Sequence, residues 1–201
     1  MILSLVLALL MVPQKAAIAV EGEPQLSPPA PWAVPFVAMP EAPELPKIDL
    51  NACPFEGCQF GEWTARKTVV VYSTWKPDRH RVATLQKGQQ VTGVTGVNII
   101  FEPGKGIFDR DVPAFGASKG DVVYMYGDCG EGAIDMWVRG RYIKCGDPQF
   151  SWKPGFGCER NCDGHWLTLG KSEWWAQVRL ADGTTGWVLV GDNFDGTDAL
   201  A

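Results

Sequence analysis

The residues of this chain with the most specific chemistry are six cysteines: Cys53, Cys58, Cys129, Cys145, Cys158 and Cys162. An even cysteine count is typical of disulfide-bonded exported proteins. Nearness in the sequence favours Cys53–Cys58 and Cys158–Cys162 and leaves Cys129–Cys145, although six cysteines allow about fifteen connectivities. The two short spacings are close to those of zinc ligands, but zinc ribbons usually have two intervening residues and export opposes free thiolates. We therefore predict disulfides and no metal.

Catalytic side chains are sparse. The chain has two histidines, His80 and His165, and a cysteine–histidine hydrolase would also need a free thiol. No motif of a serine hydrolase, a zinc protease or a phosphate-binding loop occurs. The acidic stretch 192–198 resembles part of a calcium loop, but the first ligand position would be Gly191 and the chain ends before the twelfth. We expect no catalytic residue and no cofactor; a small hydrolase that uses His80 or His165 is the alternative.

Nine tryptophans make up the most unusual feature of the composition. Trp174 and Trp175 are adjacent, so in a strand they point to opposite faces. The apolar alternation through Ala176 and Val178 places Trp174 in the core. We therefore expect Trp175 to face a groove or an inserted segment.

Other aromatic side chains extend this prediction. Trp137 alternates away from the apolar residues Met136 and Val138 and lies near Arg139 and Tyr142. Exposed rings of this kind stack on sugars or peptides; in the alternative interpretation they cover the second face of a barrel. The candidate binding residues are Trp175, Trp137, Tyr142 and Arg139.

The elements that carry these residues are predicted to be β-strands. Helical periodicity is rare, whereas β-branched and aromatic runs are frequent. The clearest hairpin has a turn at Asp182-Gly183, where glycine supplies the positive φ of a tight turn. Gly93 and Gly96 are expected at bulges or bends. The predicted strands include 68–72, 90–101, 121–126, 174–180 and 184–190. Many short strands with frequent turns indicate an all-β barrel or sandwich.

The pattern of the first and last strands resembles the bacterial SH3-like (SH3b) repeat. The positions that match are Leu85, Gly88, Trp175, Val178, Gly183, Gly186, Trp187 and Val188. The stretches 52–58, 62–64 and 194–200 also resemble an uncharacterised family of secreted bacterial SH3-domain proteins. The resemblance implies a small SH3-like barrel that carries an insertion at about 102–171 with its own hairpin at 121–143. It implies no catalytic activity.

The beginning of the chain is predicted to be an export signal. Residues 2–12 are apolar or small and carry no charge, and this apolar segment is too short to cross a membrane. Residues 17–19 read Ala-Ile-Ala, the small-x-small pattern of a signal-peptide cleavage site. We assign 1–19 as a signal peptide, so the mature protein is secreted or periplasmic and has no stable membrane span.

Residues 20–50 are predicted to form a proline-rich linker before a domain at 51–201. Eight prolines lie between positions 24 and 46, and proline disfavours helices and central strands. The linker is a spacer, a ligand for a proline-binding module or an inert tether. Its apolar residues Trp32, Phe36, Val37 and Met39 are able to pack back onto the domain.

The net charge of −5 argues against nucleic acid and anionic membranes as partners. These observations together predict an exported, non-enzymatic SH3b-like binding module for a peptide or glycan of the cell envelope. The alternatives are the small secreted hydrolase and a structural or assembly partner that uses the proline-rich arm.

Overall fold

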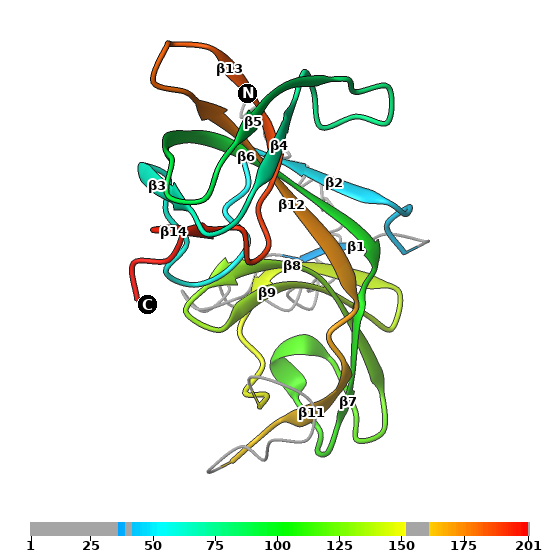
Figure 1. The fold of residues 1–201 in the computed structure, drawn as a ribbon. Helices are drawn as coiled ribbons and strands as arrows, with labels where there is room; N and C mark the ends of the chain where they lie inside the picture. The colour runs from blue at the N-terminus through cyan, green and yellow to red at the C-terminus, as the bar shows by residue number, and fades with distance from the viewer. Residues whose placement is uncertain (1–35, 39–41, 152–160, 201) are drawn as a thin grey trace, which may run out of the picture. The chain divides into compact units, whose positions relative to one another are not determined.

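The computed structural model describes residues 36–38, 42–151 and 161–200 (Figure 1). The predicted signal peptide, most of the proline-rich segment and Cys158 lie outside these residues. The described residues form an all-β fold with a single 3-10 turn, η1 (Pro113–Phe115). Among them, no helix is long and apolar enough to cross a membrane.

The larger sheet, sheet B, has eight antiparallel strands and curls as half a barrel (Figure 1). Its strands are β2 (Lys47–Leu50), β3 (Glu62–Ala65), β4 (Val69–Tyr72), β5 (Arg81–Leu85), β6 (Gln90–Glu102), β12 (Lys171–Arg179), β13 (Thr185–Leu189) and β14 (Phe194–Asp195). They pair in the order β14-β3-β6-β12-β13-β4-β5, and β2 pairs with the second half of β6. The long strand β6 therefore pairs with three strands, β2, β3 and β12.

The second sheet, sheet A, has six antiparallel strands. They are β1 (Phe36–Ala38), β7 (Gly104–Phe108), β8 (Val122–Gly130), β9 (Ala133–Val138), β10 (Arg141–Gly146) and β11 (Gly164–Thr168). Their order is β1-β10-β9-β8-β7-β11. The chain leaves sheet B after Glu102 and returns at Lys171, which are Cα partners and form an ion pair of 2.5 Å. These are the bounds at which the sequence predicts an insertion.

Each sheet has a hydrophobic core of its own because apolar residues alternate along its strands. Sheet B buries Trp63, Val71, Trp174, Val178 and Val188 together with other apolar side chains. Sheet A buries a separate cluster that includes Phe108, Val123, Met136, Val138 and Ile143. The predicted alternation along β9 is confirmed, since Ile134, Met136 and Val138 are all buried.

The hairpin of β12 and β13 forms at the predicted position. Gly183 adopts a φ of +85°, and the carboxylate of Asp182 accepts a hydrogen bond from the backbone N–H of Thr184 at 2.8 Å. The two glycines of β6 have different roles. The register between β6 and β12 shifts next to Gly93, as expected for a bulge, whereas Gly96 pairs regularly with Ala176.

The folded part begins earlier than residue 51. Residues 47–50 form β2 against β6, and 36–38 form β1 against β10. The end of the predicted linker is thus built into both sheets, because an edge strand tolerates prolines next to it.

Candidate functional site

Trp174 and Trp175 point to opposite faces of sheet B, as the pleat of β12 requires. Trp174 packs in the core, where its ring lies 5.5 Å from that of Phe55 and 5.6 Å from that of Trp63. Its indole Nε1–H donates to the carbonyl oxygen of Ala52 at 3.2 Å. The prediction that Trp174 faces inward is confirmed.

Trp175 differs from its prediction in one respect. It lies on the second face of sheet B but is only 2% exposed, because it packs with Val97 and Ile99 under neighbouring aromatic side chains. Three of these neighbours are partly buried: Tyr72, Trp75 and Trp187. A strand period assigns a face, whereas burial on that face depends on what other strands place over it.

Arg79 covers Trp175 from the solvent side. Its guanidinium carbon lies 4.6 Å from the ring centroid of Trp175 and 5.3 Å from that of Tyr72. Nη1 donates to the carbonyl oxygen of Lys76 at 3.3 Å, and no carboxylate of the described residues forms an ion pair with Arg79. A guanidinium that lies over aromatic rings without a carboxylate partner keeps N–H donors available for an anionic or polar ligand.

A hollow of about 260 Å³ lies beside this stack. We call the hollow and its lining the Trp175 surface: Thr68, Val69, Val70, Tyr72, Arg79, Glu173, Trp175, Leu189 and Asn193. The carboxylate of Glu173 accepts a hydrogen bond from Trp175 Nε1 at 2.8 Å and so fixes the plane of the indole. The surface combines aromatic, apolar and charged groups in one small concavity.

The other predicted binding residues lie on sheet A, so the four do not form one site. Trp137 and Tyr142 are Cα partners on neighbouring strands, and the ring of Tyr124 lies 5.9 Å from that of Trp137. Trp137 is half-buried, and its indole nitrogen has no hydrogen-bond partner among the described residues. Arg139 lies at the hairpin turn instead, where its guanidinium donates to the carbonyl oxygen of Gly116 at 3.2 Å.

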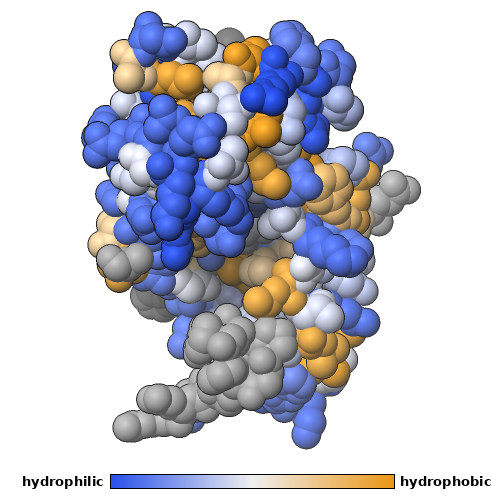
Figure 2. All heavy atoms as spheres, viewed as in Figure 1, coloured by the Kyte–Doolittle hydropathy of each residue, from blue (hydrophilic) through white to orange (hydrophobic). Residues whose placement is uncertain are grey.

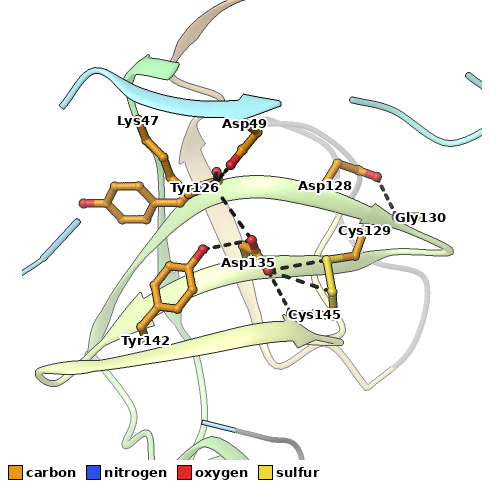
Figure 3. Close-up of a disulfide and its surroundings, with 9 residues drawn as sticks. All are labelled: Lys47, Asp49, Tyr126, Asp128, Cys129, Gly130, Asp135, Tyr142 and Cys145. Carbon is orange, nitrogen blue, oxygen red and sulfur yellow. Dashed lines mark hydrogen bonds and ion pairs between the residues drawn. A yellow bond between two sulfur atoms is a disulfide. The ribbon is translucent and has the colours of Figure 1, made fainter. Parts of the chain in front are cut away.

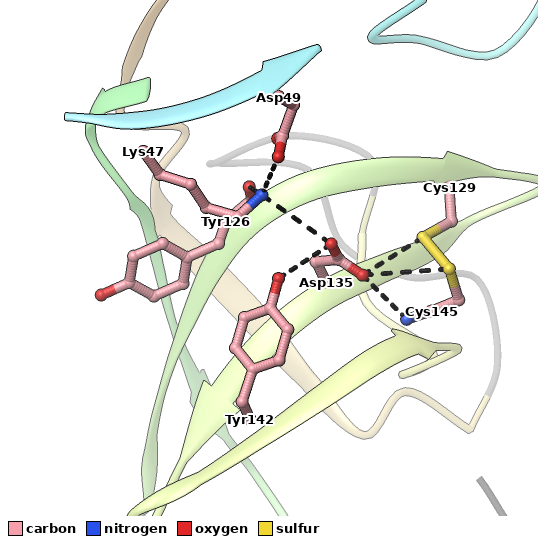
Figure 4. A network of polar contacts seen from close by, with 7 residues as sticks. All are labelled: Lys47, Asp49, Tyr126, Cys129, Asp135, Tyr142 and Cys145. Carbon is pink, nitrogen blue, oxygen red and sulfur yellow. Dashed lines mark hydrogen bonds and ion pairs between the residues drawn. A yellow bond between two sulfur atoms is a disulfide. The ribbon is translucent and has the colours of Figure 1, made fainter. Parts of the chain in front are cut away.

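Tyr142 belongs to a polar network that joins the two sheets (Figure 3). Its hydroxyl donates to the carboxylate of Asp135 at 2.8 Å, and Lys47 of β2 lies 3.9 Å from the same carboxylate. Lys47 also pairs with Asp49, and it donates to the carbonyl oxygen of Tyr126 at 3.1 Å (Figure 4). Burial, followed by the contact with Asp135, raises the pKa of Tyr142. The network is consistent with a structural role in which β2 fastens sheet B to sheet A.

Two of the three predicted disulfides are confirmed. They are Cys53–Cys58 and Cys129–Cys145. Cys162 is also disulfide-bonded, while its predicted partner Cys158 lies outside the described residues. Cys129 and Cys145 cluster with Asp135, but sulfurs joined in a disulfide are not thiolate ligands for a metal.

Each histidine contacts one polar side chain of a neighbouring segment. His80 Nδ1 lies 3.1 Å from Ser73 Oγ, which also accepts the backbone N–H of His80 at 3.2 Å. His165 Nδ1 lies 2.8 Å from a carboxylate oxygen of Asp109. These contacts link neighbouring segments, and the described cysteines offer no free thiol beside either ring.

Further hollows lie where the two sheets meet. Four of them share Asp128 of β8 as a lining residue. The face seen in Figure 2 is hollowed near its centre, with apolar side chains at the bottom of the hollow. Sequence reasoning missed this region because its lining residues come from distant segments that carry no common motif.

The chain matches no protein-family model, no curated protein and no solved structure. The candidate surfaces are therefore interpreted from their own chemistry.

Proposed function

We propose that the protein is an exported, non-enzymatic binding module that uses the Trp175 surface to hold a peptide or glycan of the cell envelope. The observation that carries the proposal is the guanidinium of Arg79, which lies within 5.3 Å of the ring centroids of Trp175 and Tyr72 and has no carboxylate partner among the described residues. Trp175 itself is only 2% exposed, so the partly buried ring of Tyr72 supplies the stacking area for a sugar or peptide, and the guanidinium of Arg79 supplies directional donors.

The resemblance to SH3b repeats supports the same proposal. Trp175, Val178 and Trp187 hold the matching positions, and Trp175 and Trp187 both take part in the aromatic cluster on the second face of sheet B. Export is supported by the disulfides, which form and persist in oxidising compartments. If the predicted signal peptide is cleaved after residue 19, the intact mass of the secreted protein should match a chain that starts at Val20.

The test is retention of purified protein on isolated envelope fractions. Arg79→Ala removes the stacked donor from an exposed position, so the fold should persist while retention falls roughly tenfold or more, as for a hot-spot residue. Arg79→Lys should restore little of this retention, since an ammonium lacks the planar fork of N–H donors of a guanidinium.

The matched control is Arg179→Ala, which removes an exposed arginine of β12 that lies outside the Trp175 surface. Retention equal to that of the unaltered protein is expected for this variant. The proposal fails if the two alanine variants lose retention equally or if the unaltered protein is not retained. Hydrolysis of the envelope fraction by the purified protein would instead favour the alternative function, a small secreted hydrolase.

A further inference from the structure

A second concave region, rich in carboxylates, lies between the two sheets. Three hollows there have volumes of about 120, 210 and 450 Å³ and share Asp128. We call this region the inter-sheet cleft. Residues from both sheets and from the segment 52–57 line it, including Asp49, Glu56, Asn98, Gly127, Asp128 and Glu131.

The cleft carries more negative than positive charge. Among the described residues, no lysine, arginine or histidine forms an ion pair with Glu56, Asp128 or Glu131. One of the two lysines in the lining, Lys171, is already paired with Glu102. An unneutralised acidic cleft attracts a cation and disfavours anions.

The environment of Asp128 adds to this imbalance. Burial raises the pKa of its carboxyl group, and the backbone N–H of Gly130, which donates to it at 2.7 Å, only partly opposes that effect. The side chain of Asp128 is nevertheless exposed, and no lysine, arginine or histidine of the described residues forms an ion pair with it. A bound cation would stabilise its charged form.

Asn98 gives an independent indication that the cleft receives a hydrogen-bond donor. This residue of β6 is only 6% exposed and lines two of the hollows. Its carboxamide oxygen is buried and has no hydrogen-bond partner among the described residues. A buried acceptor without a partner costs about 1–3 kcal/mol, so a donor that enters the cleft would remove a penalty.

A divalent metal ion fits this site poorly. Calcium needs six to eight oxygens at about 2.3–2.6 Å. No three carboxylates of the described residues lie within 4.8 Å of one another. Carboxylates spread along a cleft suit instead an organic cation that carries several N–H donors on a flexible chain.

We propose that the inter-sheet cleft binds the ammonium group of a lysine-like side chain, with Asp128 as its charge partner and Asn98 as an acceptor. The apolar lining, which includes Ile100 and Met125, receives the methylene groups of that side chain. The site is separate from the Trp175 surface, and the proposal does not rest on the function proposed above.

The test measures binding of two peptide probes to the intact protein by calorimetry. The first is acetyl-Gly-Lys-Gly-amide, and the second is the same peptide with its lysine acetylated on Nε, which removes the charge. We expect the first to bind and the second to bind at least tenfold more weakly. Equal affinity, or no binding of the first probe, would overturn the proposal.

Two variants locate the site. Asp128→Asn keeps the shape of the side chain but removes its charge. It should weaken the affinity for the lysine peptide about tenfold or more, as expected for loss of a hydrogen bond to a charged group. Asp78→Asn, an exposed carboxylate outside the cleft, is the matched control and should bind as the unaltered protein does. The assignment would be contradicted if calcium ions alone displaced the lysine peptide. It would also be contradicted if the Asp128→Asn and Asp78→Asn variants bound that peptide equally well.

Discussion

Replacing Trp175 with alanine tests whether the second face of sheet B is a packed structure. The side chain is 2% exposed and lies 5.9 Å, centroid to centroid, from the ring of Tyr72. Its N–H donates to Glu173. Loss of a buried aromatic side chain costs about 3–5 kcal/mol. Since 1 kcal/mol shifts Tm by about 2–4 °C in a domain of this size, Tm should fall by about 6–20 °C.

Thermal and urea unfolding followed by tryptophan fluorescence measure this change. The matched control is Leu189→Ala, because Leu189 is the Cα partner of Trp175 on β13 but is 36% exposed. It should cost less than about 1 kcal/mol. If Trp175→Ala is no more destabilising than this control, the tryptophan does not contribute to packing and the argument from burial is wrong.

Three further predictions concern single contacts. Gly96→Ala should destabilise the protein by about 1–3 kcal/mol in urea, because a Cβ there would lie 2.4 Å from Trp174 Nε1 and from a backbone oxygen; unchanged stability would contradict this. The pKa of Tyr142 is raised in the folded protein, so the neutral hydroxyl stabilises the fold below pH about 10, and this contribution to stability is lost as the pH rises further. In an ultraviolet pH titration, the Tyr142→Phe variant should lack one tyrosine that ionises late in the unaltered protein. Replacing both Cys129 and Cys145, 16 positions apart, with serine should cost about 3 kcal/mol, and an unchanged Tm would refute this.

The sequence by itself determined the local features of the fold. Alternation fixes which side chains of a strand share a face, so it placed Trp174 in the core and Trp175 opposite. Asp182-Gly183 determined the turn between β12 and β13 because a tight turn needs a residue with positive φ. Nearness in the chain also indicated the pair Cys53–Cys58, since a short loop closes at little entropic cost.

Only the tertiary structure decided what covers each face and what meets across the two sheets. Arg79 lies 96 positions before Trp175 yet covers its ring, and no local period connects the two. Gly96 resembles a bulge residue in the sequence, but the structure uses its missing side chain to admit the indole of Trp174. Asn98 and Asp128 line the same cleft because two separate sheets meet there. Such contacts depend on the packing of distant segments, which strand periodicity does not encode.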